Sequence, residues 1–286
     1  MKIQELRNIG RNKLVEKNIE DVFIKIDILL QYLLKMNKTE LIVNQEKEIS
    51  RVIENKYLKC IEEIINGKPI QYITKTQEFM NLKFYVDENV LIPQPDTEIL
   101  VEETIKKINE IKKEKTIKVL DMCTGSGAIA IAIKKYANEI NKEVEVYATD
   151  ISEAAIKIAK KNAKKNGAKV NFILSDMFEN IKESEFDIIV SNPPYIESKT
   201  ISTLSKEVQN EPYIALDGGK DGLKFYKIIA QNANKFLKEK GQLLLEIGYN
   251  QKESVMKVFE YTKKYFCISC IKDLSNNDRV LKFILI

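Results

Sequence analysis

Histidine and tryptophan are both absent from this sequence of 286 residues. The lack of histidine excludes every catalytic triad that needs an imidazole, every histidine-ligated metal and every histidine general base. We therefore expect no metal site, and a reaction whose proton transfers do not depend on an imidazole.

Cysteine is scarce, with residues only at Cys60, Cys123, Cys267 and Cys270. Four thiols at this spacing do not make a disulfide framework. Cys267 and Cys270 form one C-x-x-C pair, but a four-ligand zinc site would need a second pair or histidines. Their segment is typical of a strand, so we expect the two side chains on opposite faces, as ordinary buried thiols and not a redox pair.

Long apolar runs are also missing. The longest apolar region, residues 22–36, is interrupted by Lys25, Asp27 and Gln31. No segment reaches the roughly 20 apolar residues of a membrane span. Residues 1–14 are polar and charged, unlike a signal peptide. We expect a soluble, cytoplasmic protein.

The composition is that of a folded protein with a sizeable core, since hydrophobic residues make up 44% and charged residues 31%. A length of 286 residues fits one large domain, or a medium domain with a small one. The net charge of +4 is mild, so it permits an acidic partner without requiring one.

The spacing of the apolar residues divides the chain into three parts. In residues 1–75 they recur at helical intervals, and a glycine and a proline within 66–69 provide a stop signal, which predicts a small helical domain. Residues 76–95 change to a period of two and then contain two prolines, which predicts a β-hairpin and a stiff link. Residues 96–286 form the third part.

Strands and helices alternate in residues 96–286, which predicts an α/β fold with a doubly wound, mostly parallel sheet. The last two strands have no helix between them and should pair as a hairpin. We expect helices at 98–114, 128–140, 152–166, 222–239 and 251–264, and strands at 117–121, 144–149, 170–174, 186–191, 242–247, 266–272 and 280–286.

The first candidate site follows the first predicted strand of this sheet. Gly125 and Gly127 allow a sharp turn and a close approach of the backbone to a ligand. The second strand ends at Asp150, whose carboxylate can accept hydrogen bonds from ribose hydroxyls. The pattern fits S-adenosylmethionine, a dinucleotide, or only a tight turn. We favour S-adenosylmethionine because Ala130 replaces the third glycine of the dinucleotide fingerprint and Asp121 would repel a pyrophosphate. The alternative for Asp121 is capping of the following helix.

The second candidate site is Asn192-Pro193-Pro194-Tyr195, directly after the strand at 186–191. The prolines fix the backbone, so the Pro193 carbonyl is free to accept a hydrogen bond, and the Asn192 side chain offers a second acceptor. Two acceptors on one NH₂ group would hold its nitrogen facing an electrophilic methyl group, without a histidine base. The alternative is a proline-rich turn with a packed Tyr195.

With these residues, the chain resembles the HemK/PrmC family, the protein-glutamine N5-methyltransferases of peptide chain release factors. The likeness extends over nearly the whole length. The N-P-P-Y motif is shared with DNA adenine methyltransferases, whereas the blocks at 67–98 and 211–222 are more specific. Further matching blocks are 119–132, 150–152, 175–176, 245–248 and 278–280.

The resemblance implies a seven-stranded class I methyltransferase fold that takes its methyl group from S-adenosylmethionine. The substrate would be the glutamine of the Gly-Gly-Gln loop of a release factor, and we expect residues 1–75 to recognise that protein. The expected catalytic residues are Asn192, Pro193 and Tyr195, which with Pro194 would hold the glutamine amide. The expected cofactor contacts are Asp121, Cys123, Thr124, Gly125, Ser126 and Gly127 around the methionine moiety, Asp150 at the ribose, Asp176 and Met177 at the adenine, and Asn192.

The chain departs from the family pattern in several places. Cys123 stands where glycine is usual, and it keeps the same backbone path if its φ is negative. Met177 replaces a frequent aromatic residue and can cover an adenine face with its thioether. Gln94 and Asp96 replace an arginine and a glutamate, and the glycine expected near Lys75 is missing.

Three other functions share parts of this pattern. A nucleic-acid adenine methyltransferase faces the same nitrogen chemistry, but it would need base extrusion and a recognition region, and no dense basic stripe is present. A glutamine methyltransferase of a ribosomal protein is closer, but the block at 92–98 resembles the release-factor branch better. A catalytically silent adaptor has no need of the amide-holding acceptors. We therefore expect a release factor as partner, no direct nucleic-acid binding and a monomer.

Overall fold

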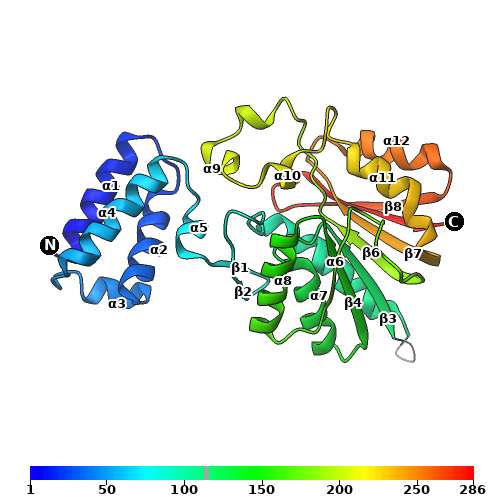
Figure 1. Ribbon diagram of the computed structural model, residues 1–286, viewed down its shortest axis with the longest axis horizontal. Coiled ribbons are helices and arrows are strands. Elements are labelled where there is room, and N and C mark those ends of the chain that lie inside the picture. Colours follow the sequence, from blue (N-terminus) through cyan, green and yellow to red (C-terminus); the bar gives the residue numbers. More distant parts are fainter. Residues whose placement is uncertain (113–115) are drawn as a thin grey trace. The chain divides into compact units, whose positions relative to one another are not determined.

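A computed structural model describes residues 1–112 and 116–286 of the chain. These residues form two compact units (Figure 1). Met1–Lys75 and Leu204–Asn210 make up the first, here called the helical unit. Thr76–Thr203 and Glu211–Ile286 make up the second, here called the sheet unit.

The helical unit buries one apolar side of each of its longer helices in a common core. The longest helix, α4, begins after Ser50, whose hydroxyl accepts a hydrogen bond from the Ile53 amide, and ends before Gly67, whose φ is +91°. The helices predicted for residues 1–75 are thus present. They are α1 (Ile3–Glu16), α2 (Val22–Leu34), α3 (Lys38–Val43), α4 (Arg51–Ile65) and α5 (Ile70–Thr74), joined by α9 (Lys206–Gln209).

The segment that carries α9 belongs to this unit through two polar contacts. The Lys25 ammonium lies 2.6 Å from a carboxylate oxygen of Glu207, and the Asn210 side-chain amide donates to the Gly67 carbonyl at 3.1 Å. Lys25 is only 7% exposed, so its charge needs such a partner. Nothing in the sequence pattern indicates this pairing, because the two partners are far apart in the chain.

The sheet unit contains a seven-stranded sheet in the order β5-β4-β3-β6-β7-β9-β8. β3 to β7 run parallel, and β9 is antiparallel to both β7 and β8, which confirms the predicted sheet and its terminal hairpin. The strands are β3 (Ile117–Met122), β4 (Val144–Asp150), β5 (Asn171–Leu174), β6 (Phe186–Ser191), β7 (Leu237–Glu246), β8 (Tyr265–Lys272) and β9 (Asp278–Leu285). The separate hairpin of β1 (Gln77–Phe79) and β2 (Leu82–Phe84) is also present.

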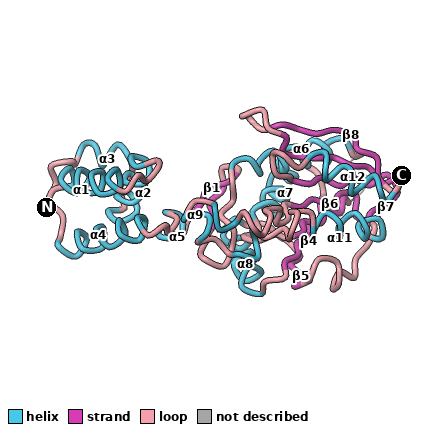
Figure 2. The backbone as a smooth tube through the Cα atoms, turned by 90° about the horizontal axis from the view of Figure 1, so that it is seen from above, coloured by secondary structure: helices cyan, strands magenta, loops and turns pink. Residues whose placement is uncertain are grey.

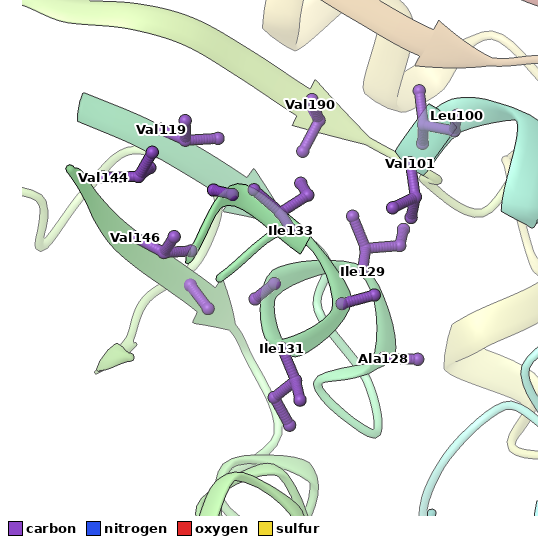
Figure 3. Packing of buried hydrophobic residues seen from close by; sticks show 14 of the residues in the cluster. Leu100, Val101, Val119, Ala128, Ile129, Ile131, Ile133, Val144, Val146 and Val190 are labelled. Atoms are coloured by element: carbon purple, nitrogen blue, oxygen red, sulfur yellow. The ribbon is translucent and has the colours of Figure 1, made fainter. Parts of the chain in front are cut away.

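Helices cover both faces of this sheet, so its central strands are buried on both sides (Figures 1 and 2). In β3, Val119 packs in the cluster that contains Ile129 and Ile133 (Figure 3), whereas Leu120 packs in the opposite cluster with Tyr226. This burial on both faces explains why apolar residues stand next to each other in the middle of the strand. One face carries α6 (Glu98–Glu110), α7 (Ala128–Glu139) and α8 (Glu153–Asn166), and the other carries α11 (Lys224–Asn232) and α12 (Lys252–Thr262).

Short helical turns complete the unit. They are the 3-10 helices η1 (Pro95–Thr97), η2 (Ile201–Thr203) and η3 (Ala233–Lys235), together with α10 (Tyr213–Leu216). Within the described residues, no helix combines the length and the apolarity needed to cross a membrane.

Two predicted helix ends are wrong. The helix expected at 222–239 stops at Asn232, and β7 begins at Leu237 because that residue pairs with Phe186 of β6, so tertiary pairing overrides the helical propensity of the segment. The helix expected at 98–114 ends at Glu110, since Ile111 is extended with ψ of 134°. Residues 113–115 of that prediction lie outside the described residues.

The expectation that Cys267 and Cys270 point to opposite faces is also wrong. An irregularity between Cys267 and Ser269 of β8 shifts the register, so Cys267 pairs with Phe283 and Cys270 with Leu281. Both partners lie in one buried cluster, against which both cysteines pack. A bulge reverses the alternation of side chains beyond it, which places the two thiols on the same face. Both are half-buried and free, and burial raises the pKa of both.

Candidate active site

The order of the strands places one cavity at the carboxyl ends of β3 and β6. The chain builds the sheet outward from β3 through β4 and β5, then returns to the other side of β3 with β6. Open α/β sheets bind ligands at such a reversal point. The predicted residues that line the cavity are Cys123, Gly125, Asp150, Asp176, Met177, Asn192 and Pro194.

Other predicted residues do not line this cavity, namely Asp121, Thr124, Ser126, Gly127, Pro193 and Tyr195. Two further segments, which the sequence did not single out for ligand contact, complete the wall. They are Asn89–Leu91, after the β1–β2 hairpin, and the stretch before and within α11 that contributes Pro212, Ile214, Ala215, Lys224, Phe225 and Ile228.

Asp121 organises the glycine loop from behind. Its Oδ2 accepts hydrogen bonds from the Thr124 hydroxyl at 2.6 Å and from the Ala130 amide at 3.2 Å. The side chain is fully buried, and this burial raises the pKa of its carboxyl to about 7. The contact with Ala130 ties the loop to the first turn of α7, which is the capping alternative considered for this residue.

Asp150 lies on the cavity wall and also holds the loop. One carboxylate oxygen accepts from the Gly125 amide at 2.8 Å, and the other accepts from the Ser152 amide at 2.9 Å. Burial raises the pKa of this carboxyl, while the backbone amides act in the opposite direction. A Cβ added to Gly125 would meet no heavy atom within 4 Å, so the loop backbone faces open space.

Cys123 and Met177 adopt backbone conformations that glycine favours. Their φ angles are +60° and +44°, so the negative φ required for Cys123 is not present. The two side chains meet on the cavity wall, with the Cys123 thiol 4.0 Å from the Met177 sulfur. Lys75 likewise has a φ of +56°. The chain therefore keeps glycine-like backbone at Cys123 and Lys75, two of its departures from the family pattern.

The Asn192 side chain is fixed from the side away from the cavity. Its Nδ2 donates to the Thr97 hydroxyl oxygen at 3.2 Å. Glu246, at the end of β7, is 2% exposed, and burial raises the pKa of its carboxyl to about 7 against the opposing influence of Thr97 and Asn192. With the amide nitrogen engaged in this way, Oδ1 is the atom of Asn192 left to accept a hydrogen bond at the cavity.

Tyr195 is held by its backbone. Its carbonyl oxygen accepts from the Gln251 side-chain amide at 2.9 Å. A Cβ on Gly218 would lie 2.7 Å from the Tyr195 Cα, so only glycine permits this close approach. The Ile196 amide also donates to the Leu216 carbonyl at 3.0 Å. These contacts bring the N-P-P-Y motif and the block at 211–222 together.

Arg279 links two of the other matching blocks. Its guanidinium lies 2.9 Å from Asp273 and 3.1 Å from Asp96, so the aspartate that replaces the usual glutamate keeps an ionic partner. Sequence reasoning assigned no function to Thr97, Glu246, Gln251 or Arg279. Thr97, Glu246 and Arg279 lie in blocks that carry the family resemblance, and only that position could have indicated a function for them. Gln251 lies outside these blocks.

The fold and cavity define a class I methyltransferase. Two family models match, "Methyltransferase small domain" over residues 97–208 and "PrmC N-terminal domain" over residues 5–74. A solved structure, a methyltransferase from Pyrococcus furiosus, superposes with a TM-score of 0.54 and 19% identity, covering 79% of this chain and 98% of that one. At this identity the likeness shows the fold.

Sequence relatives define the family more closely. The release factor glutamine methyltransferase of Clostridium acetobutylicum is 41% identical, covering 98% of each chain. The enzyme of the same name from Buchnera aphidicola is 40% identical, covering 96% of this chain and 97% of the relative. The chain belongs to the release factor glutamine methyltransferase family.

Proposed function

We propose that this chain transfers a methyl group from S-adenosylmethionine to the side-chain amide nitrogen of a glutamine in a peptide chain release factor. The observation that carries the proposal is the fixed Asn192 amide. Its nitrogen is bound to Thr97, which leaves its carbonyl oxygen as a hydrogen-bond acceptor on the wall of the cavity. Asp150 and Gly125 lie on the wall of the same cavity.

The residues of the wall fit the proposed methyl donor. Asp150 offers a carboxylate to ribose hydroxyls, and the backbone at Gly125 faces open space where the methionine moiety can approach. Asp176 and Met177, after β5, would border the adenine. When bound, S-adenosylmethionine supplies a methyl group on a positively charged sulfur, which is electrophilic enough for displacement by nitrogen.

Asn192 and Pro193 would orient the glutamine amide. An amide nitrogen is a poor nucleophile because its lone pair is delocalised. Oδ1 of Asn192 and the carbonyl of Pro193 would each accept one of its two N–H bonds and hold the nitrogen in the orientation needed for in-line attack. The same carbonyl dipoles face the positive charge that develops on the nitrogen, an effect typically worth about 2.7–4 kcal/mol for each preorganised contact.

The finer features of the substrate follow the family resemblance. We propose that the glutamine lies in the Gly-Gly-Gln loop, that residues 1–75 recognise the release factor, and that the protein acts as a monomer in the cytoplasm. Pro194, which lines the cavity, would pack beside the glutamine side chain.

The test is a side-by-side methylation assay. Labelled S-adenosylmethionine is incubated with the chain and, separately, with purified release factors, ribosomal proteins and DNA. We expect label in a release factor, and we expect none in a release factor whose Gly-Gly-Gln glutamine is replaced by glutamate. Asn192→Ala is the matched control for contaminating activity. Label in ribosomal protein or DNA, with none in release factors, would contradict the proposal.

A further inference from the structure

Two buried polar side chains from separate segments meet behind Asn192. Thr97 ends the 3-10 helix η1 and is 4% exposed, and Glu246 ends β7 and is 2% exposed. Neither residue lines the cavity. Burial of polar groups is costly unless they have partners, so their position here calls for a physical reason.

The hydrogen bond from Asn192 to Thr97, together with the nearby carboxyl of Glu246, favours one orientation of the Asn192 amide. The Thr97 oxygen accepts from Asn192 Nδ2 at 3.2 Å, which leaves the single O–H of Thr97 to donate. Glu246 is close enough that Thr97 and Asn192 both lower the pKa of its carboxyl against the effect of burial, and in its charged form it can only accept hydrogen bonds. If the Asn192 amide turned over, its oxygen in place of the NH₂ group would face the charged form of Glu246, and the repulsion would oppose that orientation.

Glu246 is itself held in place. Its carbonyl oxygen accepts from the Tyr226 hydroxyl at 2.8 Å, and the next residue, Ile247, donates its amide to the Arg279 carbonyl at 2.9 Å. Thr97 is fixed at the end of η1, where its amide donates to the Gln94 carbonyl at 3.1 Å. Glu246 therefore belongs to the packed sheet, and Thr97 to a hydrogen-bonded helical turn.

We propose that Thr97 and Glu246 are positioning residues for the methyl transfer, which hold the Asn192 amide with Oδ1, and not Nδ2, towards the glutamine. This inference rests on the proposed function. A reversed Asn192 would present N–H donors to a substrate group that is itself a donor, and the orienting contact would be lost. Thr97 and Glu246 act through Asn192 and touch neither the substrate nor the methyl donor.

The test compares Thr97→Val with Thr97→Ser. Valine keeps the volume of threonine but has no hydroxyl, whereas serine keeps the hydroxyl. We expect Thr97→Val to lower kcat about 10- to 100-fold, the range expected when a buried donor loses its partner. Binding of S-adenosylmethionine, measured by calorimetry, should stay within about 2-fold, because the substitution leaves Gly125 and Asp150 on the cavity wall unchanged. Thr97→Ser should retain most of the wild-type kcat.

A double variant separates positioning from general damage. In an Asn192→Ala background, Thr97→Val should cause no further loss, because the group it orients is already gone. An unchanged kcat in Thr97→Val, or a full second loss in the double variant, would overturn the inference. If Thr97→Val fails to fold, Thr97→Ala removes the same hydroxyl without adding bulk and is compared in the same way.

A spectroscopic measurement needs no activity. The side-chain NH₂ signals of Asn192, assigned by their disappearance in Asn192→Ala, should exchange with solvent faster in Thr97→Val than in Thr97→Ser. Equal exchange would overturn the inference. A wild-type chain that methylates release factors while Thr97→Val matches it refutes the positioning role alone. A wild-type chain with no activity on release factors refutes the proposed function, and the positioning role with it.

Discussion

The two halves of the cavity wall are built by different means. The half formed by Cys123, Gly125 and Asp150, here called the donor half, depends on backbone amides and one carboxylate at the ends of neighbouring strands. The half formed by Asn192 depends on a side chain whose amide nitrogen donates to Thr97, from a segment far away in the sequence. A hydrogen-bond acceptor can thus be held in place by nearby backbone amides, as at Asp150, or by a side chain from a distant segment, as at Asn192.

The halves also differ in backbone conformation. Cys123 and Met177 have positive φ angles, whereas none of residues 192–195 does. Non-glycine residues in the left-handed region are typically strained by roughly 1 kcal/mol or more. The methyl-donor side of the wall therefore contains strained backbone at Cys123 and Met177. The Asn192 side is instead positioned by a buried polar side chain. This contrast can be tested half by half.

The largest effect is expected at Asn192. Asn192→Ala removes one of the two amide acceptors and should lower kcat by about 100- to 1000-fold, equivalent to about 2.7–4 kcal/mol. The affinity for S-adenosylmethionine should fall much less, because the contact strengthens as charge develops on the nitrogen. Steady-state kinetics on a release factor and calorimetry measure the two quantities. Asn192→Asp keeps acceptor oxygens and should retain more activity than Asn192→Ala, and near-normal kcat in Asn192→Ala would refute the role.

Asp150→Ala should mainly weaken binding of the methyl donor. It removes the proposed ribose acceptor and also leaves the Gly125 amide without its 2.8 Å partner. We expect the dissociation constant of S-adenosylmethionine to rise about 10- to 150-fold, as for loss of hydrogen bonds to a charged group of about 1.5–3 kcal/mol. Asp150→Asn keeps one acceptor and should lie between Asp150→Ala and wild type. An unchanged affinity of Asp150→Ala for S-adenosylmethionine, measured by calorimetry, would contradict the proposed role of Asp150 in binding it.

Asp121 should make stability depend on pH. Burial raises the pKa of its carboxyl from 3.8 to about 7, so the folded protein binds this proton more tightly than the unfolded chain does. Stability contributed by the protonated form is therefore lost as the pH rises from about 4 to 7. Asp121→Asn stays neutral, so the unfolding free energy of this variant, relative to that of the wild type, should increase by about 2–3 kcal/mol between pH 5 and pH 8. Denaturant unfolding of both proteins at pH 5 and pH 8 measures this change. The same difference in unfolding free energy between variant and wild type at both pH values would contradict the burial argument.

The smallest effect concerns Cys123. Its φ of +60° favours glycine, so Cys123→Gly should be about 1 kcal/mol more stable than Cys123→Ala. Cys60 provides the matched control because it lies inside α4, where alanine should be the more stable replacement by roughly 0.5–1 kcal/mol. Thermal or denaturant unfolding of the four variants tests this, and the same order at both positions would show that Cys123 is not strained.

The place of Gly125 and Asp150 on the cavity wall could be predicted because each lies at or just after the end of a strand that the sequence marks clearly. Gly125 follows β3, and Asp150 lies at the end of β4. The pairing of Asn192 with Thr97 could not be predicted, since no local pattern shows which side chains meet when they are 95 positions apart. The bulge at Cys267 and the early start of β7 escaped prediction for the same reason, because both are set by the partner strand.

The most direct test of the division into two halves is a single-turnover methylation of a release factor at saturating S-adenosylmethionine, for Asp150→Ala and Asn192→Ala side by side. We predict that saturation restores most of the wild-type rate to Asp150→Ala, since its defect lies in binding the donor. Asn192→Ala should remain about 100- to 1000-fold slow, since its defect lies in the transition state. Recovery of both variants, or of neither, would contradict the account.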